Sequence, residues 1–202
     1  MAWLTQPTRS RILDAAEHHF AADGFTASGV DQIAATAGVS KSHLYYHFES
    51  KARLLECLIE LRTAQLLAEK DRLFREPVAD LFAQPERLVG LTSSILTELL
   101  VPNRAFIRMV LVESIRNPGV ARPVIAAIDA VLDDSLSRFG AIGRPVDPVR
   151  ARRWLFFFGV LPALYAVAAD EALGLPGGLA DLAGDLAALE IALIPGLFEE
   201  GR

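Results

Sequence analysis

The sequence predicts an all-α protein with a small N-terminal domain and a larger helical C-terminal domain. Apolar residues recur with a period of about 3.6 residues over most of the chain, and no stretch of strand length alternates with a period of two. Gly and Pro residues separate the periodic segments. The chain has 202 residues, 52% of them hydrophobic, which is enough for one large domain or two small ones.

The first predicted helix covers residues 8–23 and ends at Gly24, which we expect in the left-handed conformation. One apolar stripe runs along it with spacings of three and four residues. The stripe consists of Ile12, Ala15, Ala16, His19 and Phe20. His19 is therefore interpreted as a core or inter-helix residue without a functional role.

A short second helix is predicted over residues 30–37. Ser28, with Asp31 three residues later, has the spacing of a capping box at its start. Gly38 ends this helix and allows a tight turn toward the next one.

Ser40 is placed to cap a third helix over residues 41–48, and Ser50 a long fourth helix. A helix, a tight glycine turn and a second helix form a helix-turn-helix unit. We therefore divide the chain into a helix-turn-helix DNA-binding domain, residues 1–50, and a helical domain, residues 51–202.

The second domain contains Leu-, Ala- and Val-rich helices between Pro and Gly breakers. The predicted helices cover residues 86–100, 103–116, 120–139, 148–172 and 179–198. The longest uncharged run, residues 154–169, is interrupted by Pro162 and is too short to span a membrane. A single cysteine and the lack of a secretory signal favour a cytoplasmic protein with no membrane partner.

The third predicted helix carries more large polar side chains than a core can bury. Leu44 and its neighbours fill the inward face. The outward set consists of Lys41, Ser42, His43, Tyr46 and His47, with the hydroxyl of Tyr45. Ammonium, hydroxyl and imidazole groups reach phosphate oxygens or base edges in a major groove. Because the net charge is −5, DNA binding must depend on this local geometry and not on bulk charge.

The segment GFTASGVDQIAATAGVSKSHLYYHFESKARLL, residues 24–55, resembles the DNA-binding segment of TetR-family transcriptional regulators. The common pattern is a Gly-aromatic-Thr turn, an Ile-Ala…Ala-Gly-Val helix, and Leu-Tyr-Tyr-His-Phe followed by a Lys. The resemblance implies a TetR-like helical dimerisation and ligand-binding domain behind the DNA-binding head. It also implies DNA contacts by Thr26, Ser40, Lys41, Ser42, His43, Tyr45, Tyr46, His47 and Lys51. For Tyr45, packing against the head is an equal alternative.

The last two predicted helices favour a homodimer. Leucines recur with nearly heptad spacing in the helix over residues 179–198, and the helix over residues 148–172 has two apolar faces. The predicted interface consists of Phe157, Val160, Leu164, Leu182, Leu186, Leu189, Leu193 and Leu197. A larger monomeric core is the alternative, but two half-sites on DNA call for two-fold symmetry. By the family resemblance, these helices form a four-helix bundle with their dimer mates.

The resemblance also implies an effector pocket among the remaining helices. One apolar face of the helix over residues 103–116 ends in a carboxylate, and aromatic residues lie in the helix over residues 148–172. The candidate lining consists of Phe106, Met109, Val110, Glu113, Trp154, Phe158 and Tyr165. The alternative is ordinary core, with Glu113 paired to Arg116 or Arg153. A small apolar or aromatic effector is the implied ligand class.

His43 and His47 have the i, i+4 spacing of a zinc-binding pair, but no further Cys or His lies nearby in the sequence to complete a tetrahedral site. Cys57 is interpreted as a small buried hydrophobe. A nucleophile elbow, a P-loop and a dinucleotide fingerprint are all missing from the sequence. We therefore predict no metal, no cofactor and no enzymatic activity.

Together these patterns and the family resemblance imply a ligand-responsive repressor that binds double-stranded operator DNA as a homodimer. A small apolar or aromatic effector is expected to release it. The alternative is a helix-turn-helix dimer regulated by a protein partner, with no small-molecule pocket.

Overall fold

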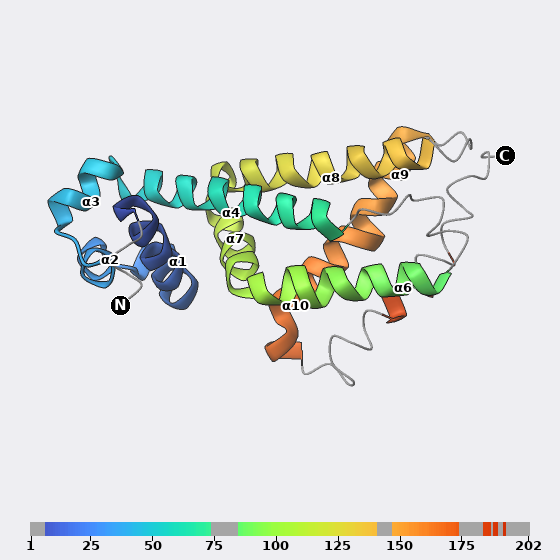
Figure 1. Ribbon diagram of the computed structural model, residues 1–202, viewed down its shortest axis with the longest axis horizontal. Helices are drawn as coiled ribbons and strands as arrows, with labels where there is room; N and C mark the ends of the chain where they lie inside the picture. The colour runs from blue at the N-terminus through green and yellow to red at the C-terminus, as the bar shows by residue number, and fades with distance from the viewer. Residues whose placement is uncertain are drawn as a thin grey trace. The chain divides into compact units, whose positions relative to one another are not determined.

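The computed structural model describes residues 7–73, 85–140 and 147–173, together with 184–186, 188, 189 and 192. Every regular element within these ranges is a helix (Figure 1), which confirms the predicted all-α class. The chain divides into two compact units, one of Met1–Ala64 with Arg108–Val124 and one of Gln65–Ile107 with Ile125–Arg202. The first unit thus extends beyond the helix-turn-helix segment, and includes residues 108–124.

The N-terminal helices of the first unit lie close to their predicted positions. They are α1 (Thr8–Ala27), α2 (Val30–Ala37), α3 (Lys41–His47) and α4 (Lys51–Leu73). Within α1 the backbone leaves the helical conformation at Gly24, where φ is 81° and ψ is 161°. Only glycine adopts this combination readily, so the predicted stop at Gly24 appears as a kink followed by one further turn.

A single apolar core holds these helices together. α1 packs against α2, and α2 against α3. The large fully buried side chains of the first unit are Ile12, Leu13, Phe20, Ile33, Leu44, Phe48, Leu54, Leu55, Leu58 and Ile59. At the edge of this core Arg62 Nε donates to Glu17 Oε1 at 3.1 Å, which links α4 to α1. Burial raises the pKa of Glu17 above its ordinary value, and the charge of Arg62 opposes this effect.

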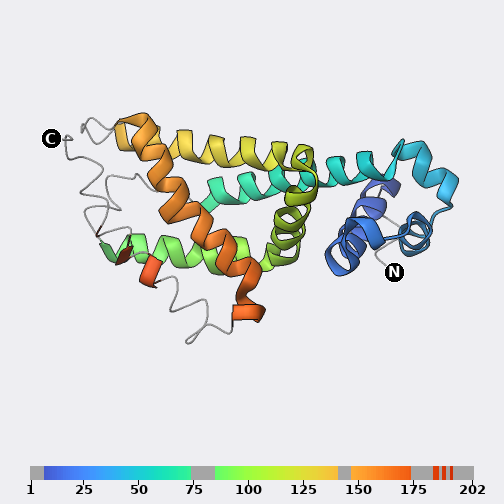
Figure 2. The same cartoon turned by 180° about the vertical axis from the view of Figure 1, so that it is seen from behind.

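The second unit contains most of the remaining helices. They are α6 (Pro85–Ser94), the start of α7 (Arg104–Arg116), α8 (Arg122–Gly140), α9 (Pro148–Leu155) and α10 (Leu161–Leu173). α8 runs beside the C-terminal part of α4 (Figure 2), where Lys70 Nζ lies 3.2 Å from Asp134 Oδ2. Arg152 of α9 joins α8 through Asp129 and Asp133, at 3.2 and 3.1 Å.

Two predicted helices of this unit are interrupted by π-helical turns, η2 (Ile95–Leu100) and η5 (Phe156–Val160). Each ends two residues before a proline, Pro102 or Pro162. A proline has no N–H for the carbonyl four residues earlier, and its ring crowds that carbonyl. A π turn takes up one extra residue and relieves this conflict. The helices predicted over residues 86–100 and 148–172 are therefore present, but not regular throughout.

The helix predicted over residues 179–198 lies mostly outside the described residues. Residues 184–186, 188, 189 and 192 are helical. Among the helices that the structure describes, none is long and apolar enough to cross a membrane.

Candidate nucleic-acid interface

The turn between α2 and α3 is closed by Gly38. Its φ of 66° and ψ of 38° place it in the left-handed region. Gly38 N–H donates to the carbonyl of Ala35 at 3.1 Å, and Val39 N–H donates to that of Ala34 at 3.0 Å. This pattern satisfies the last carbonyls of α2 and reverses the chain within two residues, so that α3 can begin at once.

Both predicted serine caps are confirmed. Ser40 Oγ accepts a hydrogen bond from His43 N–H at 3.1 Å, and Ser50 Oγ accepts one from Arg53 N–H at 3.0 Å. Each cap satisfies a donor that the first turn of a helix leaves free. Together they fix where α3 and α4 start, and thereby which residues of α3 face inward.

The predicted capping box at Ser28 is wrong. Gly29 occupies the N-cap position of α2, and its N–H donates to Gln32 Oε1 at 2.9 Å. Ser28 is buried instead, with Oγ 2.7 Å from the carbonyl oxygen of Gly24 and 2.9 Å from that of His19. The carbonyl of Gly24 also accepts a hydrogen bond from Ser28 N–H at 3.2 Å. The backbone and the hydroxyl of Ser28 therefore both close the last turn of α1, and the hydroxyl does not cap α2.

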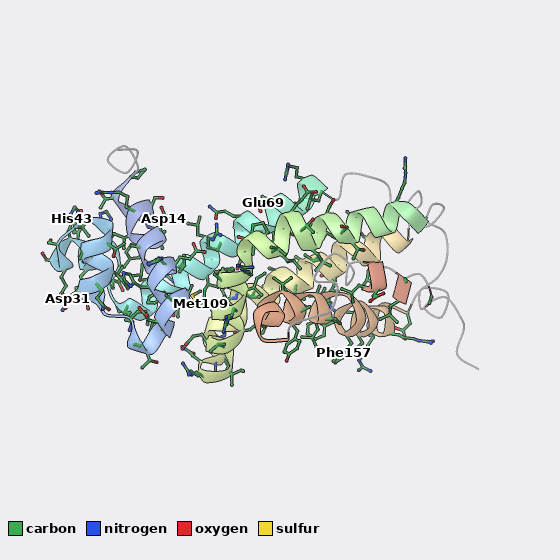
Figure 3. The ribbon with its side chains drawn as sticks, turned by 90° about the horizontal axis from the view of Figure 1, so that it is seen from below. Asp14, Asp31, His43, Glu69, Met109 and Phe157 are labelled. Carbon is green, nitrogen blue, oxygen red and sulfur yellow. The ribbon has the colours of Figure 1, made fainter. Side chains whose placement is uncertain are left out.

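α3 is held to the head by one side of the helix. Leu44 is 0% exposed and Phe48, directly after the helix, is 2% exposed. On the other side Tyr46 is 83% exposed. Ser40, Lys41, Ser42, His43 and Tyr45 are also exposed, and His47 is half-buried. The predicted outward set therefore does lie on the surface, and Figure 3 shows His43 at this end of the head.

Lys41 is paired with a carboxylate that the sequence pattern did not assign to this surface. Lys41 Nζ donates to Asp31 Oδ2 of α2 at 3.0 Å. This hydrogen bond, together with the charge of Asp31, raises the pKa of Lys41 above its ordinary value. Asp31 thus holds the ammonium beside the start of α3. The contact spans ten residues in sequence, and no periodicity signals it.

Lys51 and Thr26, both predicted to contact DNA, lie next to each other. Lys51 Nζ donates to the carbonyl oxygen of Thr26 at 3.3 Å and stands 4.6 Å from the centroid of the Phe25 ring. Burial lowers the pKa of Lys51, and the carboxylate of Glu113 acts in the opposite direction. The side chain of Thr26 itself is exposed.

One further side chain of the head, Arg9, lies beside this surface and was not predicted there. The guanidinium carbon of Arg9 lies 5.0 Å from the centroid of the Phe48 ring. Arg9 is exposed in the first turn of α1, and its contact with Phe48 places its charge beside the end of α3. His19 Nε2 lies 2.9 Å from Thr36 Oγ1, which joins α1 to α2 and agrees with its predicted inter-helix role.

The four candidate effector residues of α7 are Phe106, Met109, Val110 and Glu113, and all four are buried. Tyr165, predicted to line the same pocket, is 59% exposed, which does not fit a cavity wall within one subunit. The side chains of Trp154 and Phe158 lie outside the described part of the structure.

Of the candidate dimer residues, Phe157 is 57% exposed, while Val160 and Leu164 are half-buried. Phe157, Leu161 and Tyr165 follow one another at intervals of four residues, and all three are exposed. The π turn η5 explains why Leu161 and Tyr165 join Phe157, since an extra residue rotates the helix that follows. Leu186 is buried and Leu189 exposed; Leu182, Leu193 and Leu197 lie outside the described residues.

Metal chelation was the alternative for His43 and His47. In the part of the chain that the structure describes, no group of three or more His, Cys, Asp or Glu side chains is placed to hold a metal ion.

A capped, outward-facing α3 after a glycine turn defines the class of helix-turn-helix proteins. A family model described as "Bacterial regulatory proteins, tetR family" matches residues 12–58, which include all of α2 and α3. Over residues 12–58 the chain therefore matches the TetR family. The matched family and relatives are transcriptional regulators and not enzymes, which agrees with the prediction of no enzymatic activity.

Individual relatives support this assignment. The HTH-type transcriptional regulator UidR of Escherichia coli (strain K12) is 34% identical over 116 residues, which is 57% of this chain. The match spans little more than half of UidR, 56% of its length. The solved structure of Salmonella enterica GusR has a TM-score of 0.67 and 26% identity, covering 96% of this chain and 98% of GusR. FadR from Bacillus subtilis, solved with stearoyl-CoA, has a TM-score of 0.64 and 20% identity over 90% of this chain and 97% of FadR, and shows the fold alone.

Proposed function

We propose that this protein is a DNA-binding transcriptional regulator that acts as a homodimer, with α3 as the recognition helix. One observation carries the proposal. Leu44 and Phe48 anchor α3 from within, while Tyr46 and the polar residues around it remain in solvent. Exposed rings do not stabilise the fold of the head, whereas in a major groove the same rings can contact phosphates and base edges.

The net charge of −5 does not oppose this function. Non-specific DNA binding depends on many basic contacts, so an acidic chain binds non-specific DNA weakly. Specific binding can still come from a few well-placed hydrogen-bond donors. The candidate donors are Thr26, Ser40, Lys41, Ser42, His43, Tyr45, Tyr46, His47 and Lys51. Three of these cations and hydroxyls are already held by their neighbours: Ser40 caps α3, Lys41 pairs with Asp31, and Lys51 bonds Thr26. Such preorganisation reduces the entropy lost on binding.

A homodimer follows from the geometry of DNA. Two recognition helices in successive major grooves stand roughly 34–36 Å apart, and one chain supplies only one of them. The exposed row of Phe157, Leu161 and Tyr165 supports a partner surface on α10 and the π turn before it. Large apolar side chains spaced along one helical face are more often covered by a partner than left in water.

For regulation, we propose a ligand-responsive repressor whose effector is a small apolar or aromatic molecule. The buried face of Phe106, Met109 and Val110 supplies apolar side chains, and the buried Glu113 supplies a polar group. FadR from Bacillus subtilis holds stearoyl-CoA on the same fold; that ligand belongs to FadR. The second candidate is a dimer regulated by a protein partner. The exposure of Tyr165 favours this second candidate, because a residue predicted to line the effector pocket faces solvent instead.

The experiment begins with a random pool of duplexes, from which the wild-type protein selects its preferred DNA. The affinity of Tyr46→Ala for the selected duplex is then measured by fluorescence anisotropy. We expect a loss of about 1–3 kcal/mol, roughly 5- to 150-fold, without a change in helical content. His18→Ala, an exposed residue of α1, is the matched control. Selection of no sequence by the wild-type protein, or unchanged affinity of Tyr46→Ala, would refute the assignment of α3.

A further inference from the structure

The recognition helix carries two imidazoles that lie against each other. The ring centroids of His43 and His47 are 5.1 Å apart, with an angle of 27° between the planes. Tyr46 borders both, at 6.2 Å from His43 and at 5.5 Å, edge to face, from His47. The pair thus sits on the outward surface of α3, with His43 exposed and His47 half-buried.

The charged and titratable groups around the pair are few. On α3 itself they are Lys41, paired with Asp31 of α2, and the phenols of Tyr45 and Tyr46. From α1, Arg9 lies on the ring of Phe48, whose other neighbour is His47 at 6.5 Å. The exposed Glu49 follows Phe48 in the chain, and Lys51 of α4 is bonded to Thr26. Neither imidazole has a carboxylate partner among the described ion pairs, in contrast to His19, which lies 3.6 Å from Asp23.

We propose that His43 and His47 bind DNA phosphate as imidazolium ions, so that DNA binding takes up protons from solution. This inference rests on the proposed function, because it assigns the chemical form in which two candidate contact residues act. A neutral imidazole carries no charge and donates one hydrogen bond, whereas an imidazolium donates two and carries a positive charge. In a chain with few cations on this surface, two protons would add much of the charge that phosphate binding needs.

The stacked geometry makes the protonation depend on DNA. The stacked rings, with centroids 5.1 Å apart, present their N–H groups to the same small region of the surface. A phosphate oxygen beside the pair favours the protonated form of the rings, since a nearby opposite charge stabilises a cation. Histidine is the side chain that changes charge between about pH 5 and pH 8, so this coupling falls in the physiological range.

The coupling predicts a pH-dependent affinity. Each proton taken up changes a binding constant by up to about tenfold per pH unit. We therefore expect the wild-type protein to bind its selected duplex at least about tenfold more tightly at pH 6 than at pH 8. The salt dependence should also become steeper at pH 6, by about 0.9 in slope for each added phosphate contact. Base reading by neutral imidazoles changes neither quantity in this way.

The test uses fluorescence anisotropy at pH 6 and pH 8 over a series of salt concentrations. The proteins are wild type, H43Q/H47Q, H43K/H47K and the matched control H18Q, which removes an exposed histidine from α1. We expect H43Q/H47Q to lose the pH dependence and H18Q to retain it. H43K/H47K carries permanent charge and should bind equally at both pH values, with the steeper salt slope.

Calorimetry of the wild-type protein in two buffers of different ionisation enthalpy counts the protons directly. An uptake between one and two per subunit near pH 7 supports the proposal, and an uptake near zero overturns it. The count also decides the case in which H43Q/H47Q fails to bind at all. A wild-type protein that binds a selected duplex without proton uptake refutes only this inference, whereas one that selects no duplex refutes the proposed function.

Discussion

The ammonium of Lys51 lies 3.3 Å from the carbonyl oxygen of Thr26, so that the first residue of α4 is bonded to the last turn of α1. The same ammonium stands 4.6 Å from the centre of the Phe25 ring. Both contacts reach the short segment between the kink at Gly24 and the start of α2. A lysine predicted to bind phosphate therefore also holds the segment that carries a second predicted contact, Thr26.

Replacing Lys51 with Met removes the charge and keeps most of the apolar stem. We expect a loss of about 1–2 kcal/mol in the free energy of DNA binding, because both a charged hydrogen bond and the proposed phosphate contact disappear. Hydrogen exchange of the amides in residues 25–28 should become faster in the free protein. Lys51→Arg keeps the cation and is the control. Unchanged exchange in Lys51→Met would show that the contact does not hold this segment.

Replacing Gly38 with Ala should destabilise the protein by about 1–2 kcal/mol, because a Cβ is unfavourable in the left-handed conformation. Gly90 offers the opposite case on α6, where the backbone is helical and nothing lies within 4 Å of an added Cβ. There we expect Gly90→Ala to stabilise by about 0.5–1 kcal/mol. Urea denaturation of both variants measures the two signs, and equal shifts would contradict the role of the positive φ at Gly38.

The pKa of Glu17 is raised by burial, so the folded protein holds this proton more tightly than the unfolded chain does. Stability from this residue therefore increases as the pH falls through its folded pKa toward its ordinary value, and the ionised form costs stability at neutral pH. We expect the free energy of unfolding of wild type, relative to Glu17→Gln, to rise between pH 7 and pH 4.5. Glu56→Gln, which removes an exposed partner of Arg53, is the control. The opposite trend would indicate that Arg62 outweighs burial.

Replacing Phe157 with Glu should convert the proposed homodimer to a monomer, because a carboxylate in the row of Phe157, Leu161 and Tyr165 would lose its hydration on association. Sedimentation velocity measures the oligomeric state, and circular dichroism checks that the subunit stays folded. Ile115→Glu is the matched control, since Ile115 is 85% exposed on α7 and outside the row. A dimer that persists in Phe157→Glu and dissociates in Ile115→Glu would move the interface to α7.

The N-terminal head could be predicted closely because its signals are local. Helix α2 has the predicted bounds, and Gly38, Ser40 and Ser50 act as expected. Each of these features depends on residues within four positions of one another. The exposure of Tyr46 followed from the same logic, since the single buried face of a seven-residue helix was already occupied by Leu44.

Features that depend on tertiary contacts could not be predicted in this way. Ser28 is the plain example, because its spacing to Asp31 suits a capping box, yet its hydroxyl bonds the carbonyl of His19, nine residues away and before the kink at Gly24. Asp31 in turn binds Lys41, ten residues away. Tyr165 was placed by counting along a regular helix, and the π turn before it changed which residues share its face.

Pro102 and Pro162 each follow a widened turn, and this has a practical consequence for comparing the chain with its relatives. One additional residue in a turn changes the azimuth of everything downstream by about 100°. A sequence alignment that ignores the π turn will therefore place the solvent-facing residues of α10 on the wrong face of the helix. The helical face of each residue should therefore be counted anew after Pro102 and after Pro162 before residues of a relative are mapped onto the helices that follow.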